Sequence, residues 1–217
     1  MTPRWNILIA TLAQRQDRFL RLLNELMPQV ARYEGYVLVT AFWNRGEYSL
    51  GEIRQDLVTA SDATYVSFVD DDDSVPPYHV EEVMKRLGRG DEGVDYVGWQ
   101  MQCYSDGTPL KPTFHSLRYR GWYDDDQGYY RDVSHLNPIR RELALRADFR
   151  LGEPPEDVSW VDQVRGHVRT EEYVDRVMYH YYSSSADSTW RGVTVDSQWR
   201  RPIVGHPHFT FHPRSSP

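Results

Sequence analysis

The sequence contains a single cysteine, Cys103, so no disulfide bond can form within the chain. This scarcity is typical of proteins in a reducing compartment, and we expect a cytoplasmic location. No apolar run approaches the ~20 residues that a membrane-spanning helix needs, so no membrane span is expected. The apolar stretch at residues 7–10 is too short for the core of a signal peptide, and the chain is therefore expected to remain where it is made.

Basic residues are also in the minority, since 25 Lys and Arg face 32 Asp and Glu, which gives a formal net charge of -7. Proteins that coat nucleic acids are usually basic, so this balance weighs against such a role, although a local basic groove remains compatible with it. The apolar content of 40% is that of an ordinary globular protein. We find no repeat and no internal linker, and we expect one domain over residues 1–190 followed by an extended tail over residues 191–217.

Short apolar runs alternate with amphipathic segments in the first hundred residues. The predicted strands are residues 5–10, 36–42, 64–69 and 94–101, and the predicted helices are residues 16–27, 51–61 and a segment that begins after Ser74. This alternation predicts an α/β fold with a mainly parallel sheet flanked by helices. The second half reads as mixed β/α, with strands at 117–123, 129–133 and 173–182 and helices at 138–147 and 156–164.

Four adjacent carboxylates, Asp70 to Asp73, directly follow the third predicted strand. Ligands bind at the carboxyl ends of strands in open α/β sheets, and a divalent cation such as Mg²⁺ would relieve the repulsion between these acids. The alternative is a solvated acidic loop in which Asp73 and Ser74 only cap the next helix. The position after a buried strand favours a metal–diphosphate site.

Three weaker motifs accompany this run. Gly51 and Arg54 begin the second predicted helix, and residues 11–15 form the loop after the first strand, where a nucleobase could be held. Glu156 and Asp157 begin a later helix, and one of them could be a general base. Each motif alone is weak, because an ordinary surface helix, a loop or a charged helix N-terminus explains it more simply.

Taken in order, the segments ILIATLAQR, SLGEIRQDLVTASDATYVSFVDDDD, DYVGWQ, HLNPIRRELA and PEDVSW resemble family 2-type glycosyltransferases of the GT-A fold. The resemblance extends over residues 7–182 and is strongest to the small stand-alone members encoded by tailed phages, which would place the protein in the host cytoplasm. It implies a metal-dependent enzyme that uses Mn²⁺ or Mg²⁺. Such an enzyme moves a sugar from a nucleotide-diphosphate donor, expected to be a UDP-sugar, to an acceptor hydroxyl with inversion.

The resemblance also implies roles for individual residues. Asp157 would be the catalytic base, with Glu156 beside it. The residues that would contact the nucleotide are Thr11, Leu12, Arg15, Arg54, Asp70, Asp71 and Asp72. The implied metal ligands are Asp70, Asp72 and His180, and the implied sugar or acceptor contacts are Trp99, His135, Asn137 and Trp160. The chain departs from the family pattern at Gln55, where Asn is usual, and at Pro155, where many relatives have Gly.

Two other classes of protein compete with this interpretation. A nucleotidyltransferase also uses paired acids on an α/β sheet, but it normally has a glycine-rich phosphate loop after the first strand, and residues 11–15 contain no glycine. A non-catalytic carbohydrate- or nucleotide-sugar-binding module would not need the intact carboxylate motifs. Three acceptors stay open, namely a hydroxymethylated base in DNA, a glycan or a protein, and the sequence does not indicate an oligomeric state.

Overall fold

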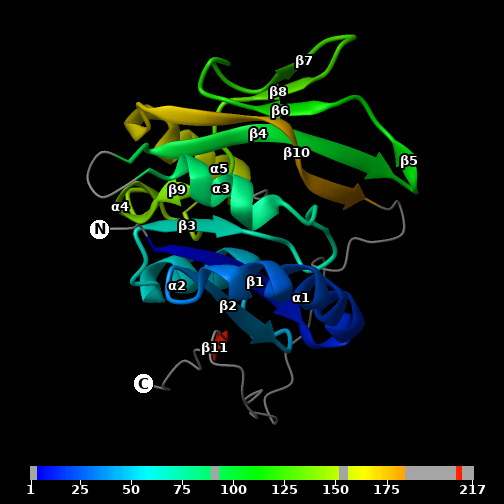
Figure 1. Cartoon of the computed structure of the whole chain (residues 1–217), viewed down its shortest axis with the longest axis vertical. Helices are drawn as coiled ribbons and strands as arrows, with labels where there is room; N and C mark the ends of the chain where they lie inside the picture. The colour runs from blue at the N-terminus through cyan, green and yellow to red at the C-terminus, as the bar shows by residue number, and fades with distance from the viewer. Residues whose placement is uncertain (1–3, 89–92, 152–155, 184–208, 212–217) are drawn as a thin grey trace.

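The structure is a computed structural model that describes residues 4–88, 93–151, 156–183 and 209–211. The described residues form an eleven-stranded sheet in the order β11-β2-β1-β3-β9-β4-β6-β8-β7, and β5 and β10 both pair with β4 (Figure 1). The strands are β1 (Trp5–Leu12), β2 (Val37–Asn44), β3 (Tyr65–Phe68), β4 (Tyr96–Ser105), β5 (Thr108–Pro109), β6 (Thr113–His115), β7 (Tyr123–Asp124), β8 (Tyr129–Arg131), β9 (Ile139–Arg140), β10 (Glu171–Ser183) and β11 (Phe209–Phe211). The helices are α1 (Gln16–Val30), α2 (Leu50–Ala60), α3 (His79–Arg86), α4 (Arg141–Ala144) and α5 (Glu156–Val164).

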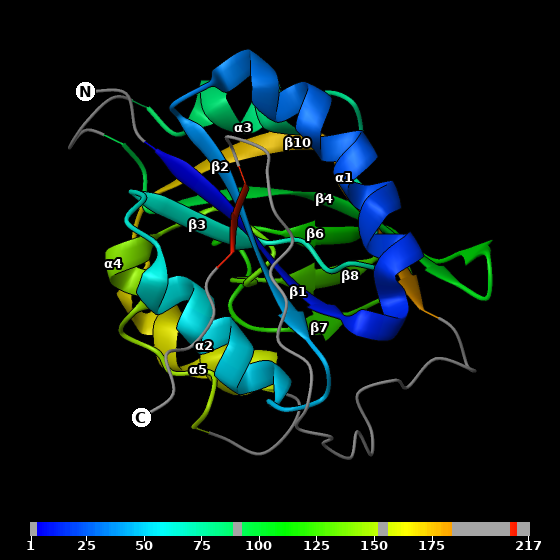
Figure 2. The ribbon, with the colours of Figure 1, turned by 90° about the horizontal axis from the view of Figure 1, so that it is seen from below.

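The first half has the predicted parallel arrangement, with β1 between β2 and β3. Every residue of β1 is buried, because the sheet is covered on both faces. Figure 2 shows α1 and α3 on one face of this part of the sheet, and α2 and α5 on the other. The α/β class predicted from the alternating pattern is confirmed, and the carboxyl ends of β1 and β3 lie side by side as a result.

Helix α1 is longer than predicted. The proline at position 28 suggested an end near residue 27, but the helix continues through Pro28 to Val30. A proline removes a helical hydrogen bond, yet burial of the Val30 side chain in the core favours the last turn. Helix α2 begins at a capping box, in which the Ser49 hydroxyl accepts from the Glu52 backbone amide and the Glu52 carboxylate accepts from the Ser49 amide.

The second half differs from the sequence prediction at two places. The helix expected over residues 138–147 is only α4, because Ile139 and Arg140 form β9 instead. The Ile139 side chain is buried and its backbone pairs with Val66 and Tyr96, so β9 joins β3 to β4. The strand expected over residues 117–123 is also wrong, since only Tyr123 of that range lies in a strand, β7. The strand that pairs with β4 in this region is β6, which was not predicted.

The expected tail over residues 191–217 lies outside the described residues except for β11, which pairs in parallel with Val39–Ala41 of β2. The described helices are all too short or too polar to cross a lipid bilayer.

One titratable side chain lies in the core between the sheet and α3. His79 is completely buried, and its ring centroid lies 5.7 Å from that of Trp5 and 5.3 Å from that of Trp99. Its Nδ1 lies 2.8 Å from the Met178 carbonyl oxygen, which it can reach as a donor in one neutral tautomer. Burial lowers the pKa of His79 to about 4, so the imidazole is neutral in the folded protein near pH 7.

Replacing His79 with Phe should make the stability less sensitive to acid. The unfolded chain binds a proton at His79 near pH 6.5, whereas the folded protein does so only near pH 4, so wild-type stability falls across this window. Relative to His79→Phe, the wild type should lose unfolding free energy as the pH falls from 6 to 4, with a steepest slope near pH 5 that approaches about 1.4 kcal/mol per pH unit. The difference between the two proteins should become constant above about pH 7.5. Urea unfolding of both proteins from pH 4 to 8 measures this, and a difference that does not change with pH would contradict a buried neutral His79.

Candidate active site

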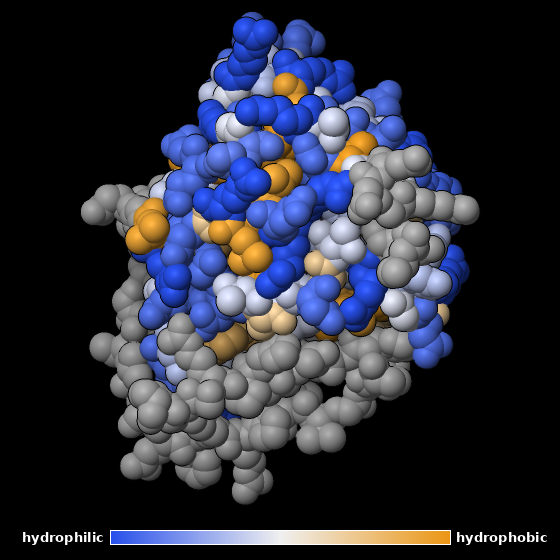
Figure 3. Space-filling model, turned by 90° about the vertical axis from the view of Figure 1, so that its left-hand side faces the viewer, coloured by the Kyte–Doolittle hydropathy of each residue, from blue (hydrophilic) through white to orange (hydrophobic). Residues whose placement is uncertain are grey.

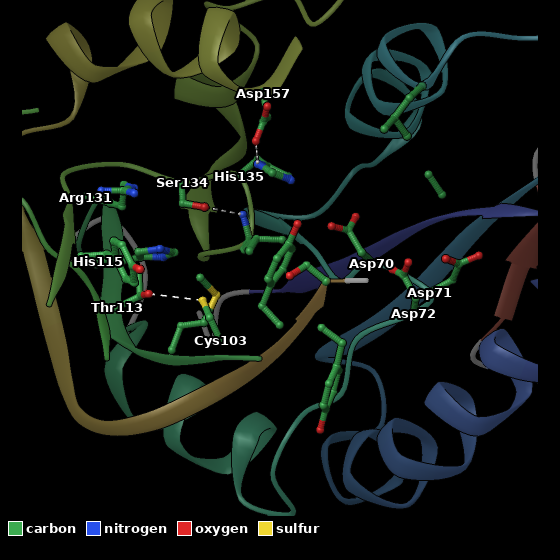
Figure 4. Close-up of a pocket in the computed structure, with 18 of the residues that line it drawn as sticks. Asp70, Asp71, Asp72, Cys103, Thr113, His115, Arg131, Ser134, His135 and Asp157 are labelled. Atoms are coloured by element: carbon green, nitrogen blue, oxygen red, sulfur yellow. Dashed lines mark hydrogen bonds and ion pairs between the residues drawn. The ribbon is translucent and has the colours of Figure 1, made fainter. Parts of the chain in front are cut away.

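A cavity of about 930 Å³ opens where the loops after β1 and β3 meet the second half of the chain. Figure 4 shows its walls: the aspartates of the loop after β3 lie on one side and polar side chains of the second half on the other, with His135 and Asp157 at a third wall. The labelled side chains are Asp70, Asp71, Asp72, Cys103, Thr113, His115, Arg131, Ser134, His135 and Asp157. The carboxyl-end location predicted for the acidic run therefore brings it to the wall of this cavity.

Asp73 anchors this loop to β10 and does not face the cavity. Its carboxylate accepts from the Tyr179 hydroxyl at 2.7 Å and from the Tyr182 backbone amide at 2.8 Å. The Tyr179 oxygen also accepts from the Asp70 amide at 3.0 Å. Burial, and then the charge of Asp70, raises the pKa of Asp73 well above its usual range. Asp73 is therefore a structural residue. The sequence suggested it as a cap of the next helix, but its carboxylate instead fixes the acidic loop to β10.

Asp71 and Asp72 are paired with the loop after β1. The Asp71 carboxylate, 2% exposed, accepts from the Thr11 hydroxyl at 2.7 Å and from Arg15 Nη1 at 2.8 Å. The same Arg15 nitrogen lies 3.0 Å from Asp72 Oδ2, and Arg18 lies 3.6 Å from that oxygen. Burial, followed by repulsion from Asp70, raises the pKa of Asp72. Thr11 thus acts on the site through Asp71, while Arg15 reaches the cavity itself.

Arg54 links the acidic loop to α5. Its guanidinium lies 3.0 Å from Asp70 Oδ1 and 2.6 Å from Glu156 Oε1, and the side chain is only 5% exposed. Burial lowers the pKa of Arg54, but Asp70, Glu156 and Asp157 together outweigh this effect and raise it. Gly51, one turn earlier on α2, lets this helix pack closely against the backbone at Phe149, because a Cβ there would lie 2.5 Å from the Phe149 carbonyl oxygen.

Asp157 lies in the first turn of α5 and faces His135, with 4.0 Å between Asp157 Oδ2 and His135 Nδ1. Burial, and then the positive charge of Arg54, lowers the pKa of His135 well below its usual range. The imidazole is therefore neutral near pH 7 and does not neutralise Asp157. His135 Nε2 is buried and has no hydrogen-bond partner among the described residues, so it is a polar group that a ligand hydroxyl could satisfy.

The structure brings most of the expected site residues to one cavity. Those that line it are Arg15, Arg54, Asp70, Asp71, Asp72, His135, Glu156 and Asp157. His180 is not among the lining residues described: its ring packs near Tyr104, while its neighbours Tyr181 and Tyr182 line the cavity.

Four further candidates lie behind the cavity wall. Leu12 and Trp99 are completely buried. Trp160 is buried against Phe149, with parallel rings 4.9 Å apart. Asn137 donates to the Val97 carbonyl oxygen at 2.9 Å and its Oδ1 lies 2.5 Å from His115 Nδ1. These side chains support the walls of the site, and the structure does not place them in contact with its contents.

Asp70 and Asp72 fit a cation of the Mg²⁺ or Mn²⁺ type. Their side chains are about one quarter exposed, and the crowding that raises the pKa of Asp72 would be relieved by a positive ion. No group of three His, Cys, Asp or Glu side chains suited to a metal occurs in the part of the chain that the structure describes. The donor set thus matches a site completed by phosphate oxygens and water, which is common for Mg²⁺, and it does not match an all-protein site that includes His180.

Sequence reasoning missed several side chains of the cavity. Arg18 and Arg21 line it beside the acidic loop, and Arg21 donates to the carbonyl oxygens of Asp72 and Asp73. The available sequence signal was the spacing of these arginines, which places them on one face of the helix directly after the loop that contains Thr11. Trp122 reaches the cavity from a loop between short strands, and no local pattern could have indicated this.

The described residues have the mixed α/β fold of a GT-A-type glycosyltransferase, as the resemblance predicted. Solved structures of S. aureus TarS, residues 1–349, share this fold at low sequence identity. The complex with UDP-GlcNAc has a TM-score of 0.59 and 14% identity over 88% of this chain and 62% of that one. The complex with UDP has a TM-score of 0.57 and 15% identity over 83% and 61% of the two chains.

This chain therefore spans about three fifths of the TarS fragment that it matches. No protein-family model matches the sequence, and no curated protein matches it significantly. The likeness establishes the fold.

Proposed function

We propose that this protein is a glycosyltransferase that uses a nucleotide-diphosphate sugar, with a UDP-sugar as the donor. The observation that carries the proposal is the buried Arg54, which joins Asp70 of the acidic loop to Glu156 at the start of α5. This ion-pair network brings three motifs, far apart in the sequence, to one cavity large enough for a nucleotide sugar. Support for the donor comes from the shared fold of TarS, which has been solved with UDP-GlcNAc.

The donor is proposed to bind beside the acidic loop. Arg15 lies next to Asp71 and Asp72 and can contact the nucleotide, with Thr11 and Leu12 shaping the loop beneath it. Asp70 and Asp72 would hold Mn²⁺ or Mg²⁺ together with diphosphate oxygens. When bound, such an ion supplies Lewis-acid neutralisation of the departing diphosphate.

Asp157 is proposed to accept the proton of the acceptor hydroxyl as its oxygen attacks the anomeric carbon. The new carbon–oxygen bond forms while the bond to the diphosphate breaks, and the leaving oxygen takes the bonding electron pair, so a single displacement inverts the anomeric centre. Glu156 is held by Arg54 at 2.6 Å, which leaves Asp157 as the better-placed base. His135, neutral and facing Asp157, is proposed to orient a sugar hydroxyl.

Donor turnover tests this proposal directly. Purified protein is incubated with UDP-, GDP- and TDP-sugars and Mn²⁺ or Mg²⁺, with and without EDTA, and released nucleotide is measured. We expect slow release of UDP from one UDP-sugar, loss of this release in EDTA and recovery on addition of Mn²⁺. Formation of UTP and sugar 1-phosphate from the UDP-sugar when pyrophosphate is added would favour the nucleotidyltransferase. Binding of a nucleotide sugar without turnover under any condition would favour the binding module.

A further inference from the structure

Large apolar side chains that remain exposed gather around the cavity. Among the described residues, four of the nine large hydrophobic side chains that are most exposed line it, namely Leu110, Trp122, Tyr181 and Tyr182. The opposite end of the molecule, at the amino ends of the parallel strands, is largely hydrophilic, with hydrophobic residues in small groups (Figure 3). Several exposed apolar side chains that meet at one hollow are a mark of a ligand-binding surface.

We define the aromatic end of the cavity as Leu110, Trp122, Tyr129 and Arg131, all of which line it. The Arg131 guanidinium lies 5.0 Å from the ring centre of Trp122 and 5.8 Å from that of Tyr129. In Figure 4, Arg131 lies across the cavity from Asp70, Asp71 and Asp72. The aromatic end therefore continues the proposed donor site on its far side.

The aromatic end is held in place before any ligand binds. The Trp122 indole donates to the Val133 carbonyl oxygen at 3.3 Å, and Arg131 Nη1 donates to the carbonyl oxygens of Tyr123 and Tyr130. Tyr130 is itself stacked on Phe114, with ring centroids 5.5 Å apart. A flat, preorganised ring surface costs little ordering entropy on binding.

The charges at this end are balanced, which disfavours a polyanion such as DNA. Arg131 is electrostatically coupled to Asp124, and Lys111, which lies over the Tyr129 ring, is coupled to Asp125. Nucleic-acid grooves instead present rows of cations to successive phosphates. Rings flanked by hydroxyl and imidazole groups, here Thr113 and His115 on the same cavity wall, suit a carbohydrate with its apolar C–H faces and its hydroxyl groups.

We propose that the aromatic end is the acceptor subsite and that the acceptor is a glycan, one sugar ring of which stacks on Trp122. A hydroxyl of the neighbouring sugar then reaches Asp157 on the third wall, between the aromatic end and the acidic loop (Figure 4). This inference rests on the proposed glycosyl transfer and specifies its acceptor class.

Glycan binding in the presence of UDP tests the inference without requiring catalysis. Saturation-transfer NMR is recorded with cellobiose, maltotriose, chitobiose and galactobiose, and with a 12-nucleotide single-stranded DNA and an unstructured peptide as competing classes. The variants are Trp122→Ala and Trp122→Phe, and Tyr36→Ala is the control because that ring is similarly exposed but does not line the cavity.

We expect at least one oligosaccharide to bind the wild type, about tenfold weaker binding by Trp122→Ala, and largely retained binding by Trp122→Phe and Tyr36→Ala. UDP affinity should be the same in all four proteins, which also shows that they fold. Glycan binding that survives Trp122→Ala, or binding of DNA or peptide but of no oligosaccharide, overturns the inference. If the wild type still turned over the donor in that case, the proposed function would stand without the inference. If the wild type did not bind UDP at all, both the proposed function and the inference would fail.

Discussion

An Asp157→Asn variant is expected to transfer sugar about 10²- to 10⁴-fold more slowly than the wild type, the range that general base catalysis usually contributes. The amide of asparagine has nearly the same shape as the carboxylate, so the cavity should be preserved, but it cannot accept the acceptor proton. Because Asp157 makes no close ion pair with Arg54 in the structure, UDP affinity should change little. The measurement is the single-turnover rate with saturating donor, together with UDP binding by calorimetry.

Asp162→Asn is the matched control for this experiment. Asp162 lies on the same helix, but its side chain is 65% exposed and pairs with Arg165 at the surface, so its replacement should leave the rate unchanged. If Asp157→Asn transferred sugar at the wild-type rate, another group would have to be the base. Glu156→Gln would then be the next variant to measure.

The parts of the fold that could be predicted are those with a strong local pattern. The runs that became β1 and β2 are apolar enough to indicate buried strands, and the acidic residues after β3 indicate where a site would lie. Residues 138–147 could not be predicted correctly, because their local preference is helical while the gap between β3 and β4 is filled by Ile139. Tertiary pairing decided the conformation there, against local propensity.

In the candidate site, too, residues marked by a local motif could be predicted, whereas contacts between distant residues could not. Arg54 and Asp157 could be found from motifs that follow predicted elements, but the sequence does not show that one guanidinium binds both Asp70 and Glu156, which are 86 residues apart. His180 was expected at the metal, but Tyr181 and Tyr182 of β10 line the cavity, whereas His180 is not among the lining residues described and its ring lies near Tyr104. Contacts of this kind depend on strand register, which is set by the whole sheet.

An Arg54→Met variant is expected to lose about 3 kcal/mol of unfolding free energy and to bind UDP at least tenfold more weakly. The substitution removes the cation that two partly buried carboxylates share, and breaking such a pair from one side is strongly destabilising because the remaining charges stay desolvated. The acidic loop would also lose its tie to α5, so Asp70 would no longer be held toward the donor. Urea unfolding and UDP calorimetry measure the two effects.

Two further variants test whether the loss of unfolding free energy comes from the ion-pair network. Arg54→Lys keeps the charge, but an ammonium group cannot present two nitrogens to Asp70 and Glu156 as the planar guanidinium does, so an intermediate stability is expected. Adding Glu156→Gln to Arg54→Met should recover part of the unfolding free energy, because one uncompensated carboxylate is then removed. If the double variant were as unstable as the sum of the two single variants, Arg54 would act through packing on Phe68, over whose ring it lies at 5.6 Å, and the ion-pair network could not be what assembles the site.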